Sequence, residues 1–436
     1  GPLARPSTSL GMSDVGSVHK EAGFEMQRHA SAVAQLSRPV YAALQPELAQ
    51  PELALTKGRS MAVFSRTETL NGRKLAFERV ALLLQGGGAL GAYQAGVYQA
   101  LHEGKIEPDW VAGISIGAIN CAIIAGNAPA ARIEKLREFW DQVSSAPDYG
   151  VADYWLALWQ GDLARSWANR LTAARTMTGG APGFFATRLP PPMLLPTGAE
   201  GATSFYDTSA LKATLQRLVD FDRINAAGAM RFSVGAVNIS TGNFEYFDNG
   251  THSIRAEHIM ASGALPPGFP AVEIDGELYW DGGVVSNTPL DWILSNLPLH
   301  DTLAFQVDLW SARGVVPRNL GQVAERLKEI QYSSRTRAST DHFRELQTAR
   351  ALVQALLDKL PDDLKRSAEA AELCRLADPS VHNIVQLIYR SPPHELESKD
   401  YNFSRAAMEA HWQQGYADAA RTLAQPQIFE RPHDSN

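Results

Sequence analysis

The order of apolar and polar positions along residues 77–142 is typical of alternating strands and helices. Residues 80–84 form a short apolar run that ends in glycines, which favours a buried strand over an amphipathic helix. The residues that follow predict a helix over 89–104, a second strand over 109–113, and two further helices over 117–125 and 130–142. Strands and helices in this rhythm predict an α/β fold with a parallel sheet covered on both faces.

The pattern changes again beyond residue 142. Residues 145–205 interrupt it with scattered aromatic residues and a triple proline, and we interpret them as an inserted cap. The α/β pattern then returns, with a helix at 208–219, strands near 231–238, 243–248 and 303–309, and a hairpin of strands at 271–274 and 277–280. After residue 313 the chain is mainly helical, with long patterned stretches at 319–357 and 402–424 around one strand at 382–389.

These changes predict three parts. Residues 1–76 are an N-terminal tail, because residues 12–60 are rich in Ala, Gln, Ser and Pro and carry no such pattern. Gly1-Pro2 resembles a protease scar, so we set residues 1–11 apart and expect the native chain to start at Met12. An α/β domain with the cap follows over residues 77–312, and a mainly helical C-terminal extension over 313–436.

Composition narrows the function classes only slightly. The 436 residues carry a formal net charge of -7, which supplies no general electrostatic reason to expect nucleic acid as a partner. Two cysteines make neither a disulfide framework nor a zinc site on their own. Because the chain shows neither a signal peptide nor an apolar run of the ~20 residues that span a bilayer, we expect a cytoplasmic protein, with peripheral contact to a membrane or lipid surface left open.

A glycine loop follows the first strand. Gly86-Gly87-Gly88-Ala89-Leu90-Gly91 matches the G-x-G-x-x-G dinucleotide fingerprint, but that fingerprint also needs an acidic residue at the end of the second strand. Here the second strand ends at Ser115 instead. Successive glycines at a helix N-terminus can still aim backbone N–H groups into one small space, where they hold a phosphate or a transient oxyanion.

Ser115 lies in the segment Gly113-Ile114-Ser115-Ile116-Gly117, which matches the G-x-S-x-G nucleophile elbow. Its position between an apolar strand and a helix favours a nucleophile over a serine that only caps the helix. Such a hydroxyl needs a base, and in most hydrolases the base is a histidine. His252 and His258 flank a loop-to-helix junction, where a structural role competes with the role of base.

Two Asp-Gly pairs offer a carboxylate. Asp275-Gly276 lies between the two arms of the hairpin and is typical of a tight turn. Asp281-Gly282-Gly283 follows the second arm and leads toward Asn287 and Pro289, which suggest the start of a helix. From the residues alone, Asp281 can be either a second turn residue or a carboxylate that serves a site.

The glycine loop, the elbow and the Asp-Gly-Gly segment, in this order, resemble the patatin-like phospholipase family over about residues 77–310. The resemblance implies a three-layer α/β/α core and a Ser-Asp dyad in place of a triad, with Ser115 as nucleophile and Asp281 as base. It also implies that Gly86, Gly87 and Gly88 supply the oxyanion hole. One departure is Leu90, which stands where the family often has an arginine. The C-terminal region is similar to an extension found on some bacterial members.

We therefore expect a carboxylic ester hydrolase that works through an acyl-enzyme on a phospholipid, lysophospholipid or other acyl ester, with no metal or organic cofactor. An acyltransferase with the same dyad, and an inactive lipid-binding scaffold, are the alternatives. Trp155, Phe184 and Phe185 of the cap are candidates for substrate binding, in an acyl-chain pocket or at a lipid surface. Packing of the insertion on the core is the competing interpretation of the same aromatic residues.

Overall fold

The structure is a computed structural model that describes residues 69–70, 73–74, 76–145, 162–295, 300–377, 380–392, 395 and 398–431. All elements below belong to the unit formed by residues 62–436. Trp155, predicted to bind substrate, lies outside the described residues.

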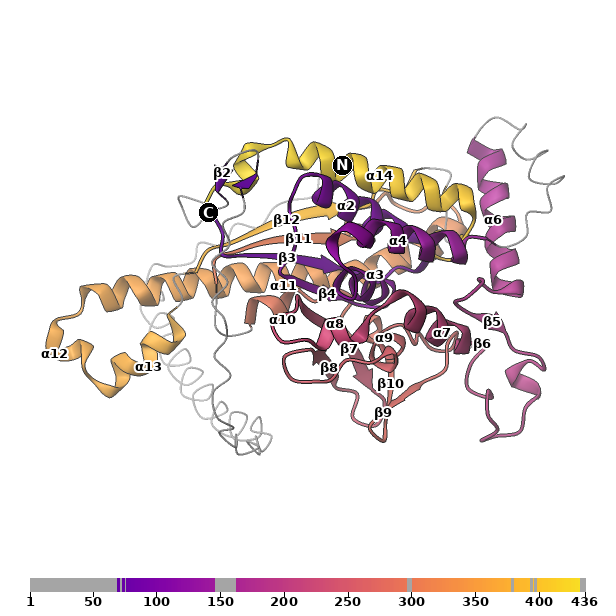
Figure 1. Cartoon of the computed structure of the whole chain (residues 1–436), viewed down its shortest axis with the longest axis horizontal. Coiled ribbons are helices and arrows are strands. Elements are labelled where there is room, and N and C mark those ends of the chain that lie inside the picture. The colour runs from indigo at the N-terminus through magenta and orange to yellow at the C-terminus, as the bar shows by residue number, and fades with distance from the viewer. Residues whose placement is uncertain are drawn as a thin grey trace, which may run out of the picture. The chain divides into compact units, whose positions relative to one another are not determined.

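An eight-stranded mixed sheet forms the centre of this unit (Figure 1). Five strands run parallel, in the spatial order β12 (His382–Ile388), β11 (Thr302–Asp308), β3 (Arg79–Leu84), β4 (Trp110–Gly113) and β7 (Arg231–Asn238). Three antiparallel strands complete it: β10 (Glu277–Asp281) beside β7, β9 (Val272–Ile274) beside β10, and β8 (Phe244–Asp248), which also pairs with β7. The predicted mainly parallel α/β sheet is therefore confirmed.

Helices cover both faces of the sheet, and small two-stranded ladders lie outside it. The helices of the α/β part are α2 (Gly91–Glu103), α3 (Ile116–Ala125), α4 (Pro129–Val143), α6 (Asp162–Gly179), α7 (Ser209–Leu218), α8 (Phe221–Asn225), α9 (Ala256–Ser262) and α10 (Leu290–Ser295). Those after β11 are α11 (Leu320–Lys359), α12 (Asp362–Lys365), α13 (Ala368–Leu376) and α14 (Arg405–Leu423). The ladders are β1 (Thr69–Leu70) with β2 (Arg73–Lys74), and β5 (Ala186–Thr187) with β6 (Tyr206–Asp207).

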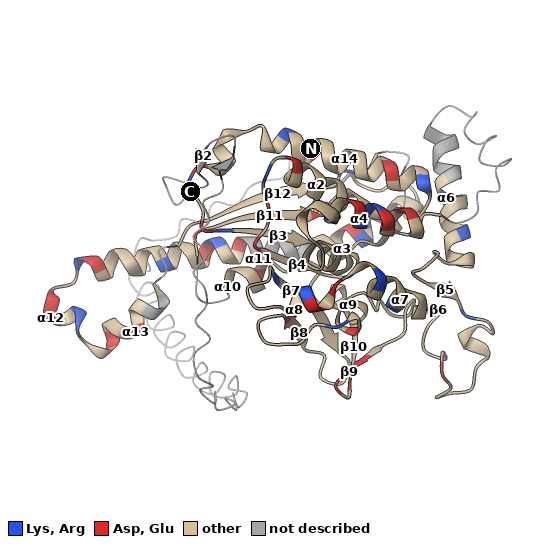
Figure 2. Ribbon diagram, in the orientation of Figure 1, with Lys and Arg blue, Asp and Glu red and all other residues tan. Residues whose placement is uncertain are grey.

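The sheet has one apolar core on each face because successive strand residues point in opposite directions. Along β3, Leu82 and Leu84 join the larger core under α2, α3 and α4, whereas Ala81 and Leu83 join a smaller core with residues of α10 and α11. Lys, Arg, Asp and Glu lie mainly on the helices and loops (Figure 2). Among the described residues, no helix is long and apolar enough to cross a membrane.

The C-terminal segment is part of the same sheet and core. It contributes the edge strand β12 and the helix α14, which packs along α2 (Figure 1). Two glycines allow this close approach, since a Cβ at Gly96 would lie 1.9 Å from the Trp412 carbonyl oxygen and one at Gly415 would lie 2.0 Å from that of Tyr93. The boundary at residue 313 remains a prediction, but beyond it the chain completes the core.

Candidate active site

Ser115 stands on a sharp turn between β4 and α3. Its backbone has φ 56° and ψ -123°, a region that non-glycine residues rarely adopt, so the turn is strained. Any larger residue in place of either flanking glycine would clash with the backbone. A Cβ at Gly113 would lie 2.4 Å from the Gly117 carbonyl, and one at Gly117 would lie 2.2 Å from the Leu84 carbonyl oxygen. The Ser115 N–H donates to the Ser262 hydroxyl at 3.0 Å, which ties the turn to the end of α9.

Strand register brings Asp281 to the level of this serine. On β7, Val234 pairs with Gly113 of β4 and Ala236 pairs with Asp281 of β10. Two residues beyond Gly113, the chain reaches Ser115, which therefore stands across β7 from the aspartate. The Ser115 side chain lies close enough to the Asp281 carboxyl to lower the pKa of that carboxyl as a hydrogen-bonding group does.

Asp281 is almost completely buried, with 2% of its surface exposed. The Gly283 N–H donates to its Oδ1 at 2.7 Å. Burial raises the pKa of Asp281 from its ordinary value of 3.8 to about 7, because the charged form loses its water, while the hydrogen bonds from Ser115 and Gly283 oppose the rise. A carboxyl with this pKa can take up and release a proton near neutral pH.

The glycine loop lies directly beside Ser115. A Cβ at Gly86 would be 3.0 Å from the Ser115 Cβ. The Gly86 carbonyl oxygen faces away into the protein, where it accepts from Asn287 Nδ2 at 3.1 Å and Trp310 Nε1 at 2.9 Å. Within the part of the chain that the structure describes, the N–H groups of Gly86, Gly87 and Gly88 have no acceptor. Three unpaired donors beside a serine hydroxyl form an arrangement that can stabilise an oxyanion.

The C-terminal segment supports this loop from outside. The 3₁₀ turn η4 (Lys399–Tyr401) packs on η1 (Gly88–Leu90), and a Cβ at Gly88 would lie 2.3 Å from the Asp400 carbonyl oxygen. Gly88 also has φ 56°, so glycine suits both its space and its conformation. Leu90, where the family often has an arginine, is completely buried in the core and offers no charge to a ligand.

Neither candidate histidine joins the site. The buried His258 accepts from the Arg255 N–H at 2.9 Å and packs edge-on against Phe247, so it serves the start of α9. Burial lowers the pKa of His258 to about 4. His252 contacts Thr251 and Phe247. Among the described residues, neither ring is hydrogen-bonded to Ser115 or Asp281.

The other aspartate of the hairpin is a turn residue, as predicted. Asp275 has φ 50° in the turn between β9 and β10, and three quarters of its side chain is exposed. Its carboxylate pairs with Arg255 at 2.9 Å. The hydrogen bond from Arg255 lowers the pKa of Asp275. Its contacts fix the turn and leave it apart from Ser115.

The two described cap residues are buried in an aromatic cluster. Phe184 and Phe185 are 6% and 4% exposed, and both rings pack against Phe269 and Phe403. This burial agrees with the packing interpretation of the cap, and binding of an acyl chain stays a prediction.

Sequence reasoning did not single out three residues that hold the site together. Ser262 accepts from the Ser115 N–H, and Trp310 and Asn287 donate to the Gly86 carbonyl. Of the three, only Asn287 could have been found from the sequence, by its position shortly after Asp-Gly-Gly. Within the described residues, no group of three or more His, Cys, Asp or Glu side chains is placed to hold a metal ion.

Comparisons with known proteins bear on the family of the chain. A family model described as patatin-like phospholipase matches residues 82–292, and one described as patatin phospholipase matches residues 330–435. Lysophospholipase nte1 of Aspergillus terreus is 27% identical over 252 residues, 57% of this chain and 13% of that protein. The human patatin-like phospholipase domain-containing protein 6 is 27% identical over 221 residues, 50% of this chain and 13% of that protein.

The chain thus spans only a small part of these curated relatives. Among solved structures, VipD from Legionella pneumophila aligns with a TM-score of 0.35 and 17% identity, over 85% of this chain and 72% of that one. The two family models together account for the α/β part and the C-terminal segment, and the chain belongs to the patatin-like phospholipase family.

Proposed function

We propose that the chain is a serine lipid acyl hydrolase in which Ser115 is the nucleophile and Asp281 its base. The observation that carries the proposal is the register that brings the strained Ser115 level with the buried Asp281, beside three unpaired backbone N–H groups. Family membership supports a lipid ester as the substrate. The names of the relatives, a lysophospholipase and a patatin-like phospholipase, point to the same substrate class.

The proposed reaction has two halves. Asp281 accepts the Ser115 proton while the serine oxygen attacks the ester carbonyl carbon, and the carbonyl electrons move onto its oxygen. The N–H groups of Gly86, Gly87 and Gly88 stabilise that oxyanion, and a single donor of this kind typically contributes ~3–4 kcal/mol. The intermediate then collapses, the departing alcohol takes the proton from Asp281, and an acyl-enzyme remains.

Water completes the cycle. Asp281 accepts a proton from the water molecule that attacks the acyl-enzyme. When the second tetrahedral intermediate collapses and the acid leaves, Asp281 returns this proton to the Ser115 oxygen. The raised pKa of Asp281 suits both directions, because the group must be ionised to start each half and protonated to finish it.

A fluorophosphonate probe tests the nucleophile directly. We expect one label per chain, on the peptide that contains Ser115, together with hydrolysis of p-nitrophenyl butyrate. Ser115→Ala should lose both the label and the hydrolysis, whereas Ser240→Ala, at an exposed serine beyond β7, should keep both. Labelling that persists in Ser115→Ala would refute the assignment. Product analysis with added glycerol separates hydrolysis from acyl transfer.

We propose that the acyl chain of the substrate binds at the aromatic cluster that contains Phe184 and Phe185. Phe184 and Phe185 supply apolar surface next to Phe269 and Phe403. If the acyl chain of the substrate binds in this cluster, Phe185→Ala should reduce turnover of palmitate esters several-fold more than turnover of butyrate esters. If the ring only packs the core, melting temperature should fall and both esters should be affected alike. Measuring melting temperature and both rates on one preparation decides between them.

A further inference from the structure

The start of α11, with the loop before it, exposes apolar side chains, and the helix turns partly buried charged ones toward the protein. On the helix, Leu320, Val323, Leu327 and Ile330 are 86%, 49%, 64% and 49% exposed. Their spacing of three, four and three residues places them in one stripe along the helix. In the loop before it, Val315 and Val316 are 81% and 86% exposed. We call these six residues the apolar face.

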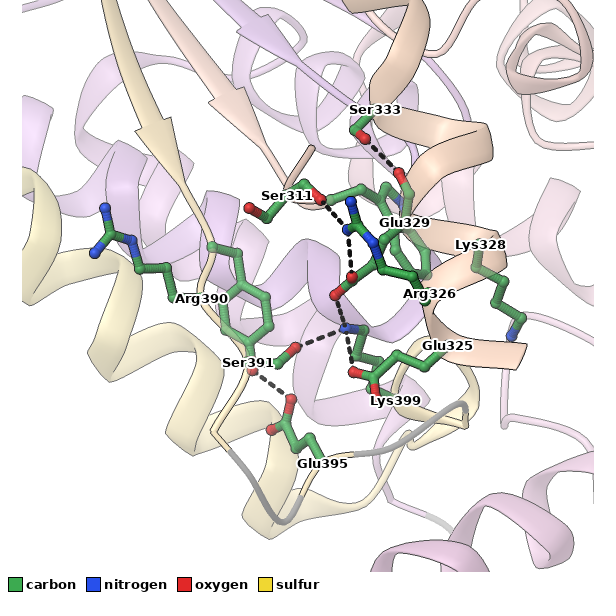
Figure 3. Close-up of polar contacts among 12 residues, drawn as sticks. Ser311, Glu325, Arg326, Lys328, Glu329, Ser333, Arg390, Ser391, Glu395 and Lys399 are labelled. Atoms are coloured by element: carbon green, nitrogen blue, oxygen red, sulfur yellow. Dashed lines mark hydrogen bonds and ion pairs between the residues drawn. The ribbon is translucent and has the colours of Figure 1, made fainter. Parts of the chain in front are cut away.

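The opposite side of the same turns is polar and faces the protein. Figure 3 shows Glu325 and Glu329 pointing from α11 toward Lys399 of the C-terminal segment, and Arg326 beside them reaching toward Ser311. The Lys399 side chain is only 2% exposed, and its ammonium lies 2.9 Å from Glu325, 3.3 Å from Glu329 and 2.7 Å from the Ser391 hydroxyl. The usual arrangement of a surface helix, with apolar side chains inward and charges outward, is therefore reversed here.

These buried ion pairs fix the reversed orientation. The Arg326 guanidinium pairs with Glu329 at 2.9 Å and donates to the backbone oxygens of Ser311 at 3.3 Å and Ala312 at 2.5 Å, so it also anchors the loop. Rotating α11 to bury the apolar face would leave Lys399 inside the protein without its carboxylates, and an unpaired buried charge is strongly unfavourable. The apolar face is thus held outward by the interior of the protein.

The apolar face adjoins the proposed active site. It begins five residues after Trp310, whose indole donates to the Gly86 carbonyl, and it ends two residues before Tyr332. The Tyr332 carbonyl accepts from the side chain of Gln85 at 3.2 Å, and the Tyr332 ring packs 5.2 Å from that of Trp310. Burial, and then the charges of Asp281 and Asp400, raise the pKa of Tyr332 to about 12. The chain at both ends of the face therefore touches the glycine loop or the residue before it.

The charges around the apolar face indicate what kind of surface it binds. Arg313 and Arg318 are exposed and flank Val315 and Val316, and residues 309–324 contain no aspartate or glutamate, although the whole chain has a net charge of -7. Apolar side chains between arginines match the boundary of a bilayer, where apolar groups enter the acyl region and cations meet anionic headgroups. A membrane of anionic phospholipid fits both the apolar and the basic part.

We propose that the apolar face docks this protein on an anionic phospholipid bilayer and so holds the Ser115 site at the surface that contains its substrate. This inference rests on the proposed lipid acyl hydrolase for its purpose, but the docking itself needs no turnover. It predicts binding to vesicles by protein that carries Ser115→Ala.

The first experiment measures co-sedimentation of the Ser115→Ala protein with vesicles of phosphatidylcholine and phosphatidylglycerol. Adding Val315→Ser with Val316→Ser, or Leu320→Gln with Leu327→Gln, should weaken partitioning roughly tenfold or more. The matched control is Leu352→Gln with Leu356→Gln, which changes two leucines exposed by 62% and 66% farther along the same helix. The control should bind as the parent does. Unchanged binding in the face variants, or an equal loss in the control, would overturn the proposal.

The second experiment tests the basic rim. Arg313→Gln with Arg318→Gln should weaken binding roughly tenfold on anionic vesicles, since each cation near such a surface contributes about 1 kcal/mol, and should leave binding to pure phosphatidylcholine unchanged. Equal effects on both vesicle types contradict the choice of an anionic surface. Sedimentation velocity provides a further check, because a change of oligomeric state in the face variants would assign the face to a second copy of the chain and overturn membrane docking.

Activity separates this inference from the proposed function. With Ser115 intact, the face variants should hydrolyse a monomeric butyrate ester at the parental rate and lose about tenfold on vesicle substrate. If vesicle binding depends on the apolar face but no ester is hydrolysed, the proposed function is refuted and the docking proposal stands. If esters are hydrolysed but vesicle binding is the same in the face variants and the parent, the docking proposal is refuted and the proposed function stands.

Discussion

Strands β10 and β11 each end in a buried aspartate, and the two sites differ in what the carboxyl contacts. Asp281 and Asp308 are 2% and 4% exposed, and burial raises the pKa of each to about 7. Asp281 accepts from the Gly283 N–H and lies close enough to Ser115 for the serine to lower its pKa. Both oxygens of Asp308 accept instead from the side chain of Gln306 on its own strand, at 3.0 and 2.8 Å. A raised pKa alone therefore does not mark a base. The contact with a strained serine distinguishes the two.

Removing each carboxylate is the strongest test of this difference. Asp281→Asn should lower kcat about a thousandfold or more, because a nucleophile and its base act as a unit. Asp308→Asn should stay within a few-fold of the parent, since an amide can still accept from Gln306. Rates on a soluble ester, with circular dichroism to check the fold, provide the comparison. Comparable losses in both variants would mean that contact with Ser115 is not the deciding feature.

The pH dependence of activity sharpens the comparison. As the proposed base, Asp281 would have to be ionised to accept the serine proton, so kcat/KM should fall about tenfold per unit below an apparent pKa near 7. Because Asp308 does not act on the serine, the acidic limb should lie at the same pH in Asp308→Asn. A limb that moves in that variant, or one centred near pH 4, would contradict the role given to Asp281.

The two buried aspartates should make the unfolding free energy depend on pH in the same way. Each folded-state pKa is raised above the ordinary value of 3.8, so the folded protein binds a proton between about pH 4 and 7 that the unfolded chain has released. The unfolding free energy contributed by each group is therefore present at low pH and is lost as pH rises through 7, by an amount on the order of a few kcal/mol.

Asp281→Asn and Asp308→Asn should accordingly gain stability relative to the parent at pH 8 and show little gain at pH 4. Urea denaturation midpoints at the two pH values measure this gain. Equal differences at both pH values would show that neither group titrates as described. A stable but inactive Asp281→Asn protein would be an example of an active site maintained at a cost in stability.

The smallest effect is expected at the exposed aspartate of the hairpin. Asp275→Asn keeps an Asx-Gly turn, which suits the same backbone, and loses only an ion pair with Arg255 at the surface. Activity should change less than twofold, and melting temperature by a degree or two. A loss of turnover approaching that of Asp281→Asn would mean that the wrong aspartate of the hairpin had been assigned as the base.

The elements of the α/β part could be predicted because their signals are local. The run at 80–84, the glycines around Ser115 and the turn at Asp275-Gly276 each set the backbone within a few residues. The place of the C-terminal segment could not be predicted in this way. Its strand was recognised at 382–389, but its pairing with β11 and the contact of Asp400 with Gly88 join residues far apart in the chain. No local pattern encodes such a contact.

The amino-acid sequence alone determined the family, the elbow serine and the order of strands and helices, since motifs and hydrophobic periodicity are carried by neighbouring residues. The residues alone left open whether Asp281 is a turn residue or serves the site, and only the resemblance named it. The tertiary structure places it level with Ser115 through the register of β4, β7 and β10, although 166 residues separate the two. It alone also showed that α11 presents its apolar side outward. Helical periodicity predicts a stripe of apolar residues, but the buried partners of Glu325, Arg326 and Glu329 determine which way that stripe faces.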